Sequence, residues 1–273
     1  MSNSGIANPR SAATISKDSR AGVATIIAVT SGKGGVGKTF VAANLAAALS
    51  RSGKKVLLLD ADLGLANLDV VFNIHPKITL HDVLTGGATL DEAIIEVTGG
   101  ISILPAASGL VEYSRLTGEV QDELSAIIDQ LAHRYDYLFL DTGAGISDLV
   151  LYSASLAREV LVVATPEPTS LTDAYATIKV LAMMQQRSIF HLLFNQVGKS
   201  GEGARYAAQL RDVVNRYLDS QTATPIELHH VGDIPNDQSV PDALKKRKLL
   251  MHAYPGSPAA MAMSKIAAAI SRI

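Results

Sequence analysis

The segment from Gly32 to Thr39 constrains the fold of this chain more than any other. It reads Gly-Lys-Gly-Gly-Val-Gly-Lys-Thr and matches the pattern G-x-x-x-x-G-K-[ST]. The apolar run at 26–29 before it predicts a buried strand, and apolar residues recur at helical spacing after it. Glycines placed between a strand and a helix let successive backbone N–H groups point at an anion, at the positive end of the helix. The segment therefore predicts a phosphate-binding loop.

The last two residues of this loop suit a nucleoside triphosphate bound with Mg²⁺. Lys38 can reach the β- and γ-phosphates, and the Thr39 hydroxyl can take a Mg²⁺ position. A chance glycine-rich turn is the alternative, which the strand before the loop and the helix after it disfavour. The nucleotide-binding residues that we predict in the loop are Gly32, Lys33, Gly34, Gly35, Val36, Gly37, Lys38 and Thr39.

A second lysine, Lys33, lies just inside the loop, where the loop backbone already occupies the side facing its own phosphates. It can instead serve a nucleotide presented by a second subunit, and a solvated surface lysine is the alternative. With this lysine the loop resembles the deviant Walker A loop, K-G-G-x-G-K-T, of the MinD/ParA family of ATPases. In that family the extra lysine reaches across an ATP-sandwich dimer. The resemblance implies ATP and Mg²⁺ as cofactors, Lys33 and Lys38 as catalytic residues, and an ATP-dependent homodimer.

Two carboxylates follow the apolar run at 56–59. Asp60 and Asp62 are two apart on an extended chain, so both leave the strand end on one side. That geometry suits one group holding hydrated Mg²⁺ and another orienting a water for attack on the γ-phosphate. The segment resembles the family's switch I, which implies that Asp62 positions the water and that Asn67 lies close to the phosphates. The alternative is that the pair only solvates the strand end.

Another aspartate, Asp141, closes the apolar run at 137–140, where a Mg²⁺-binding Walker B aspartate is expected. The predicted metal ligands are thus Thr39, Asp60 and Asp141. The residues that follow resemble the family's switch II, D-x-P-A-G, with Gly143 in place of the proline. This replacement should loosen the loop, because proline restricts the backbone and glycine does not.

Two further segments indicate a base pocket. Asn195 follows the apolar run at 189–194, and its amide can both donate and accept hydrogen bonds at an adenine edge. The segment at 232–237, which includes Pro235, resembles the loop that walls the base in the family. A turn rich in Asn, Asp, Gly and Pro is the alternative for this second segment.

Strand patterns alternate with helical patterns along the chain, which predicts a mostly parallel sheet covered on both faces. The fold class that we expect is α/β: a single-domain, three-layer P-loop NTPase fold with a mostly parallel seven- or eight-stranded sheet flanked by helices. Residues 1–22 are predicted to be a flexible tail, and 23–273 the MinD/ParA-like ATPase domain. The predicted strands are 24–30, 55–60, 101–104, 136–141, 159–164, 189–194 and 226–231. The predicted helices include 37–51, 120–133, 169–186 and 203–218.

Composition excludes several relatives and partners. The 273 residues contain no cysteine, so the iron–sulfur carriers, the nitrogenase iron proteins and the zinc-clasped tail-anchor ATPases are excluded. A formal net charge of −2 predicts no general attraction to nucleic acid or to an anionic membrane. Without an apolar run of transmembrane length or a hydrophobic signal core, a cytoplasmic location is expected.

The motifs at 60–70, 105–109 and 167–176 most resemble the FlhG/FleN branch, the MinD-like ATPases that regulate flagellar number and placement. The implied partner is a protein, a flagellar regulator or assembly factor, with Glu167 and Asp173 as candidate contacts. Residues 1–22 lack the D-Q-A-x-x-L-R segment of many FlhG proteins. The C-terminal segment is mostly alanine, so we expect a core-packed helix and no stable membrane anchor.

Two other functions remain open. A ParA-like ATPase that positions DNA or cargo would use the basic run at 245–248, but a solvated helix face is the favoured interpretation of that run, so DNA binding is not favoured. The other is an ATP-dependent ligase of the cobyrinate or dethiobiotin type. Lys33 disfavours the ligase, since an enzyme acting on a small acid needs no lysine reaching across a dimer.

Overall fold

The computed structural model describes residues 22–62, 67–106 and 116–273. The predicted tail at 1–22, apart from its last residue, lies outside the described residues. So do residues 63–66 of the predicted switch I and residues 107–109 of the motif at 105–109.

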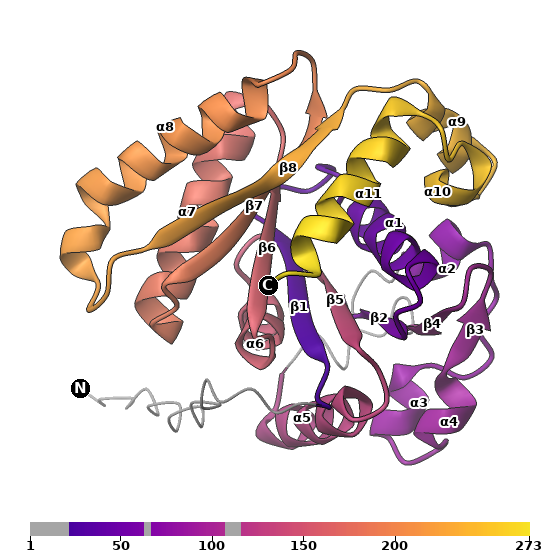
Figure 1. Ribbon diagram of the computed structural model, residues 1–273. Coiled ribbons are helices and arrows are strands. Elements are labelled where there is room, and N and C mark those ends of the chain that lie inside the picture. The colour runs from indigo at the N-terminus through magenta and orange to yellow at the C-terminus, as the bar shows by residue number, and fades with distance from the viewer. Residues whose placement is uncertain (1–21, 63–66, 107–115) are drawn as a thin grey trace, which may run out of the picture.

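One eight-stranded sheet runs through the described chain (Figure 1), with the strand order β3-β4-β2-β5-β1-β6-β7-β8. Every neighbouring pair is parallel except β3 and β4, which are antiparallel. The strands are β1 (Thr25–Ser31), β2 (Val56–Asp60), β3 (Ile95–Val97), β4 (Ile101–Leu104), β5 (Tyr137–Ala144), β6 (Glu159–Ala164), β7 (Ile189–Val197) and β8 (Glu227–Pro235).

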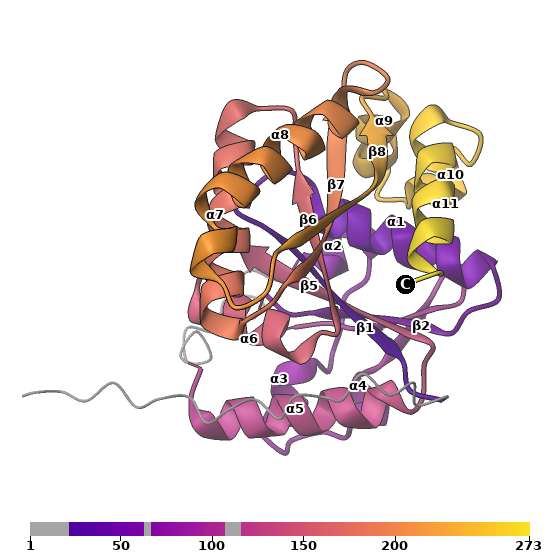
Figure 2. The same ribbon diagram turned by 60° about the vertical axis from the view of Figure 1, so that its left-hand side comes forward.

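Helices cover both faces of this sheet and form two separate cores (Figures 1 and 2). One face packs against α3 (Leu80–Leu84), α4 (Leu90–Ala93), α5 (Gly118–Ala132), α6 (Asp148–Leu156), α7 (Pro168–Gln185) and α8 (Glu202–Tyr217). The other packs against α1 (Lys38–Arg51), α2 (Leu68–Phe72), α9 (Ser239–Lys245), α10 (Leu250–Ala253) and α11 (Pro258–Ile270). A short 3₁₀ helix, η2 (Asp219–Gln221), follows α8.

The sequence of the central strands explains the three layers. Successive side chains of a strand point to opposite faces, so Ile26 and Ala28 enter one core while Ile27 and Val29 enter the other. Both cores exclude water, which is why these strands are nearly continuous apolar runs rather than alternating ones. The predicted three-layer, mostly parallel α/β fold is confirmed.

The predicted strands and the four predicted helices all form, with ends shifted by a few residues. The edge strand β3, of only three residues, was not predicted. Helix α6, which is not one of the four helices given by range, begins after Ser147, whose side chain accepts a hydrogen bond from the Val150 N–H. Strands β7 and β8 each extend three or four residues past the predicted ends, and these extensions carry part of the candidate site.

The C-terminal segment packs against the core as predicted, although two of its apolar side chains are exposed. Met263, Ile266 and Ile270 of α11 are buried against α1 and β8, so the helix belongs to the core. Met261 of the same helix, and Ile273 after its end, are exposed. Among the described residues, no helix combines the length and the apolar character that crossing a membrane would require.

The basic run at 245–248 does not form the predicted helix face. Helix α9 ends at Lys245, and Arg247 has a φ of 49°, which is incompatible with a continuing helix. The run is an exposed turn in which Lys246 donates to the Tyr254 hydroxyl.

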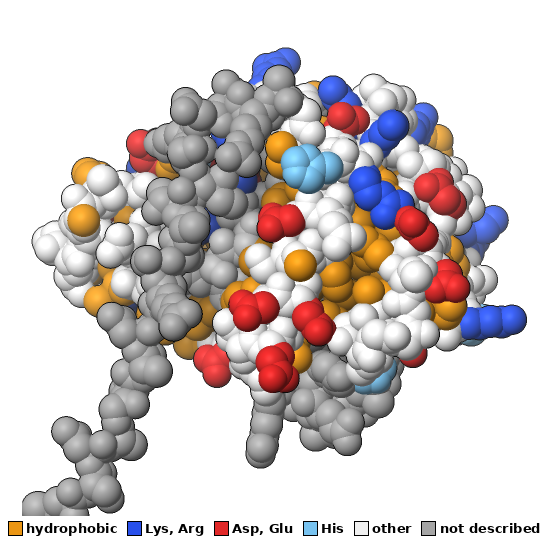
Figure 3. Space-filling view, turned by 90° about the horizontal axis from the view of Figure 1, so that it is seen from below, with side chains coloured by type: hydrophobic (Ala, Val, Ile, Leu, Met, Phe, Trp, Pro, Cys, Tyr) orange, Lys and Arg blue, Asp and Glu red, His pale blue; other side chains and the backbone are white. Residues whose placement is uncertain are grey.

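The molecular face seen from below carries scattered acidic side chains, with basic ones to one side (Figure 3). The part of this face that the described residues form therefore presents no uniform positive charge to a nucleic acid.

Candidate nucleotide site

The predicted site residues come together at the carboxyl edge of the parallel strands. The loop at 32–37 joins the central strand β1 to α1, while Asp60 ends β2 and Asp141 lies in β5. Strand β5 lies between β1 and β2. Because β2 pairs with β5 in parallel, Asp60 and Asp141 are direct partners in register. Asn195 and Pro235 lie near the ends of β7 and β8, on the other side of the loop. This edge is where open α/β sheets bind their ligands.

Glycines give the loop its shape. Gly35 and Gly37 have φ values of 79° and 94°, a region that other residues rarely adopt. Gly32 is required for a different reason, since a Cβ there would lie 2.1 Å from the Asp173 carbonyl oxygen. The start of the loop is thus pressed against the backbone of α7, and a side chain at Gly32 would separate the two.

Lys38 and Thr39, the first residues of α1, lie against Asp141. Burial lowers the pKa of Lys38, and the nearby carboxylates of Asp141 and Asp62 oppose that shift. The Thr39 hydroxyl hydrogen-bonds the Asp141 carboxylate. The Asp141 Oδ1 is buried and has no hydrogen-bond partner among the described residues. This edge therefore combines a buried cation, a hydroxyl and an incompletely satisfied carboxylate.

The carboxylates of Asp60 and Asp141 are both buried and adjacent. Burial and the repulsion of Asp141 raise the pKa of Asp60 to about 7, although three backbone N–H groups oppose the rise. Burial likewise raises the pKa of Asp141 to about 6, against the Thr39 hydrogen bond and the charge of Lys38. Two buried carboxylates with raised pKa values and an unpartnered oxygen fit a divalent cation, because hard oxygen ligands suit Mg²⁺.

Asp60 also holds the chain on both sides of residues 63–66. Its Oδ1 accepts a hydrogen bond from the Asp62 N–H, and its Oδ2 accepts from the Asn67 and Leu68 N–H groups. Asp62 itself is half-buried, with Gly143 close by: a Cβ on Gly143 would lie 3.3 Å from the Asp62 Oδ2. Asn67 is exposed, and its backbone N–H is one of the donors to Asp60.

Lys33 points away from this cluster, toward α7. Its ammonium lies 2.5 Å from the Glu167 carboxylate and 3.1 Å from the Thr169 hydroxyl. Glu167 was predicted as a candidate contact for a protein partner, and its pairing with Lys33 was not predicted. The two are 134 residues apart along the chain, and no local pattern links them.

Asn195 and Pro235 form the side of the site next to β7 and β8. Pro235 is paired in register with Val197, and the Asn236 N–H donates to the Val197 carbonyl. The Asn195 amide donates a 2.8 Å hydrogen bond to the Val36 carbonyl in the loop. Asn195 is therefore adjacent to the loop, whereas Pro235 lies on the neighbouring strand β8, opposite Val197.

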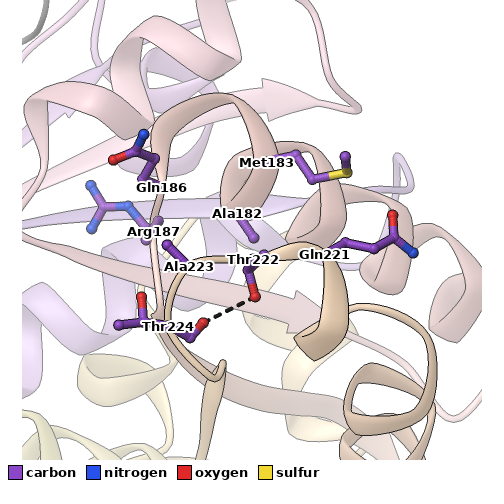
Figure 4. Close-up of a pocket in the computed structure, with 8 residues that line it drawn as sticks. All are labelled: Ala182, Met183, Gln186, Arg187, Gln221, Thr222, Ala223 and Thr224. Atoms are coloured by element: carbon purple, nitrogen blue, oxygen red, sulfur yellow. Dashed lines mark hydrogen bonds between the residues drawn. The ribbon is translucent and has the colours of Figure 1, made fainter.

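A hollow lies at the opposite edge of the sheet, where β7 and β8 begin. It has a volume of about 170 Å³, between the end of α7 and the segment after η2, and thus beside the residues that precede β7 and β8. Figure 4 shows its lining, in which Thr222 hydrogen-bonds the Thr224 carbonyl. None of the predicted site residues lines it.

The strand–loop–helix unit, the buried Lys38, the Thr39 hydroxyl and the paired carboxylates define a P-loop nucleoside triphosphatase. The family model that matches residues 22–271 is that of ParA, described as an NUBPL iron-transfer P-loop NTPase. The chain belongs to this ParA/MinD family, and it is an ATPase with ATP and Mg²⁺ as its cofactors.

Curated relatives and solved structures agree with this assignment. The chain is 43% identical over 242 residues to the antiactivator FleN of Pseudomonas aeruginosa, covering 89% of this chain and 84% of the relative. It is 35% identical to the flagellum site-determining protein YlxH of Helicobacter pylori, covering 88% and 80%. MinD of Pyrococcus furiosus is similar with a TM-score of 0.72 and 30% identity, covering 90% and 98%. MinD of Pyrococcus horikoshii, solved with Mg-ADP, has a TM-score of 0.72 and 28% identity, covering 91% and 96%.

Proposed function

We propose that this ATPase is a nucleotide-controlled switch that regulates flagellar number or placement. The observation that carries the proposal is the 43% identity to the antiactivator FleN, which extends over most of both chains. The similarity to the flagellum site-determining protein YlxH supports the same process. The family model is described as an iron-transfer protein, but this chain cannot bind iron through thiolates, because the sequence has no cysteine.

In the proposed cycle, the loop holds the phosphates of ATP. The backbone N–H groups and Lys38 bind the phosphate oxygens, and Thr39, Asp60 and Asp141 hold the cation. Bound Mg²⁺ would neutralise phosphate charge. Asp62 lies on the same strand end as Asp60, close to Lys38, and is assigned to orient the attacking water. Asn195 and Pro235 are assigned to the side of the site that faces the base, and Asn67 to the region near the phosphates.

The switch is proposed to dimerise when ATP is bound. Two triphosphates facing each other across a dimer repel unless cations lie between them, and Lys33 is the cation at the rim of the loop. Its side chain is 38% exposed, so it can leave Glu167 without unpacking the core. ADP lacks the γ-phosphate that Lys33 of a second copy would contact, so ADP should not support the dimer.

The proposed output is contact with a flagellar regulator or assembly factor in the cytoplasm. Glu167 and Asp173 lie at the beginning of α7, directly beside the loop, so this surface would change with nucleotide state. Helix α11 is packed into the core and is not free to act as a membrane anchor. Liposome co-sedimentation with ATP tests this point, and pelleting that depends on ATP would contradict it.

Deletion of the gene tests the proposed function most directly. Flagella per cell, counted by electron microscopy, should change in number or position in the deletion strain and return to normal with the wild-type gene. The Lys38→Ala variant should fail to restore them, because it removes the cation aimed at the β- and γ-phosphates. Normal flagella in the deletion strain, with mis-segregated DNA or cargo instead, would contradict the proposal.

The exposed basic turn at 245–248 favours one second candidate, a ParA-like ATPase that binds DNA. Phosphate contacts make such binding strongly salt-dependent. DNA binding with ATP, measured at two salt concentrations, separates the two functions. A ParA-like ATPase should bind DNA with an affinity that falls with salt and that is lost when the four basic residues are neutralised. A switch that acts only on a protein should show no such DNA affinity.

A further inference from the structure

Asn195 lies at an irregularity in the sheet. The register between β7 and β8 shifts between Phe194 and Val197, so the residues between them leave the regular ladder. Gln196 has a φ of 60°, a left-handed conformation that is uncommon for a residue other than glycine. Bulges and strained residues of this kind re-aim a neighbouring side chain. Here they turn the Asn195 side chain toward the phosphate-binding loop.

Both ends of the Asn195 amide are engaged at this position. The Nδ2 donates to the Val36 carbonyl oxygen at 2.8 Å, and the Oδ1 accepts from the Gln196 N–H at 2.9 Å. Asn195 is only 5% exposed and Val36 only 2%, so this carbonyl lies where water cannot easily replace the amide. The hydrogen bond joins residues 159 apart in the sequence, from opposite sides of the site.

The neighbouring glycine fits the same arrangement. A Cβ on Gly37 would lie 2.5 Å from the Asn195 Nδ2, which is closer than such atoms approach. Gly37 therefore has two reasons to lack a side chain: its φ of 94° and the amide packed against it. The amide thus supports the loop at Val36 and Gly37, directly before Lys38.

We propose that Asn195 is a positioning residue that holds the phosphate-binding loop in its anion-binding shape. It would then set the affinity for the triphosphate part of the nucleotide, apart from any contact that this side of the site makes with the base. Without the amide, the buried Val36 carbonyl loses its donor and the loop gains freedom that must be lost again when phosphate binds. This proposal deepens the ATP site of the proposed function and rests on it.

The test compares Mg²⁺-ATP with Mg²⁺-tripolyphosphate, which has no base, by titration calorimetry. Asn195→Ala should weaken tripolyphosphate about fivefold, as expected for one net hydrogen bond, and ATP by at least the same factor. Asn195→Asp keeps the volume but cannot donate to Val36, so it should weaken both at least as much. It also serves if the alanine variant fails to fold. Asn215→Ala, on the exposed surface of α8, is the matched control and should change neither affinity.

Weaker ATP binding with unchanged tripolyphosphate binding would overturn the proposal, because Asn195 would then act on the base alone and not on the loop. Unchanged affinity for both ligands would overturn it as well. Neither result would contradict the proposed ATP site itself. A wild-type chain that bound neither ligand would instead contradict that site, so the two failures are distinguishable.

Discussion

The Lys33 ammonium lies 2.5 Å from the Glu167 carboxylate, so the extra lysine of the loop is held within its own chain. Glu167 is the N-cap residue of α7, and Thr169 in the first turn adds a second contact. If Lys33 is to reach a nucleotide in a second subunit, it must first leave these partners. The Lys33–Glu167 pair therefore competes with the proposed dimer.

Glu167→Gln should favour the ATP-bound dimer. The two side chains are 38% and 59% exposed, so the ion pair is worth only about 0–1 kcal/mol, and the dimer dissociation constant should fall by about two- to fivefold. Analytical ultracentrifugation with ATP measures this change. Asp91→Asn breaks a comparable surface pair with Arg134, at 2.6 Å, and should leave the dimer unchanged. A weaker dimer in Glu167→Gln would show that Glu167 acts across the interface instead.

Asp62→Ala should slow hydrolysis without releasing ATP. The variant removes the carboxylate assigned to the water but leaves the loop, Lys38 and Asp60 in place, so kcat should fall roughly 10²- to 10⁴-fold. Phosphate release and nucleotide retention, measured on the same sample, check both parts. Turnover equal to wild type would exclude Asp62 as the catalytic carboxylate and direct attention to Asp60.

Gly143→Ala should also reduce turnover, through Asp62. The added Cβ would lie 3.3 Å from the Asp62 Oδ2, so the carboxylate must move by a few tenths of an ångström. Because a misplacement of about 1 Å can cost ~10²-fold in rate, kcat should fall by about three- to tenfold with KM for ATP unchanged. Gly118→Ala, where a Cβ meets nothing within 4 Å, is the control. In an Asp62→Ala background, Gly143→Ala should have no further effect, and an additive loss would contradict the contact.

The stability of the nucleotide-free protein should fall as pH rises from about 4 to about 7. Asp60 and Asp141 have pKa values of about 7 and about 6 in the folded chain, above the ordinary value of 3.8. Within this window the folded state binds more protons than the unfolded state, so raising the pH favours unfolding. Thermal unfolding of wild type and Asp60→Asn across this range isolates the effect, and Mg²⁺ should restore stability at the upper end. A pH dependence identical in both proteins would contradict the raised pKa of Asp60.

The sequence predicted the loop and the carboxylates because each is encoded locally. Asp60 and Asp141 each follow an apolar run, and a buried parallel strand is recognisable from such a run alone. Their adjacency then follows from strand order, which places β2 beside β5. The edge strand β3 was missed because three residues, with Glu96 facing solvent, form too short a pattern to distinguish from a turn.

The contacts between distant segments could not be predicted in the same way. Nothing in the sequence around Lys33 specifies Glu167 as its partner, and nothing around Asn195 specifies the Val36 carbonyl. Both depend on how α7 and β7 pack beside the loop. The basic run at 245–248 was assigned to a helix because its composition allows one. Helix α9 instead ends at Lys245, and the Arg247 side chain, two residues later, donates a hydrogen bond to Asn73.

Sedimentation velocity of wild type and Lys33→Ala, with ATP and with ADP, tests the central claim most directly. Asp62→Ala should be included in both backgrounds so that hydrolysis does not deplete the ATP. The account predicts a dimer for the Lys33-containing chains with ATP, a monomer with ADP, and a monomer for Lys33→Ala with ATP still bound. An ATP-dependent dimer in Lys33→Ala, or equal dimerisation with ADP, would contradict a switch in which this lysine senses the γ-phosphate of a second subunit.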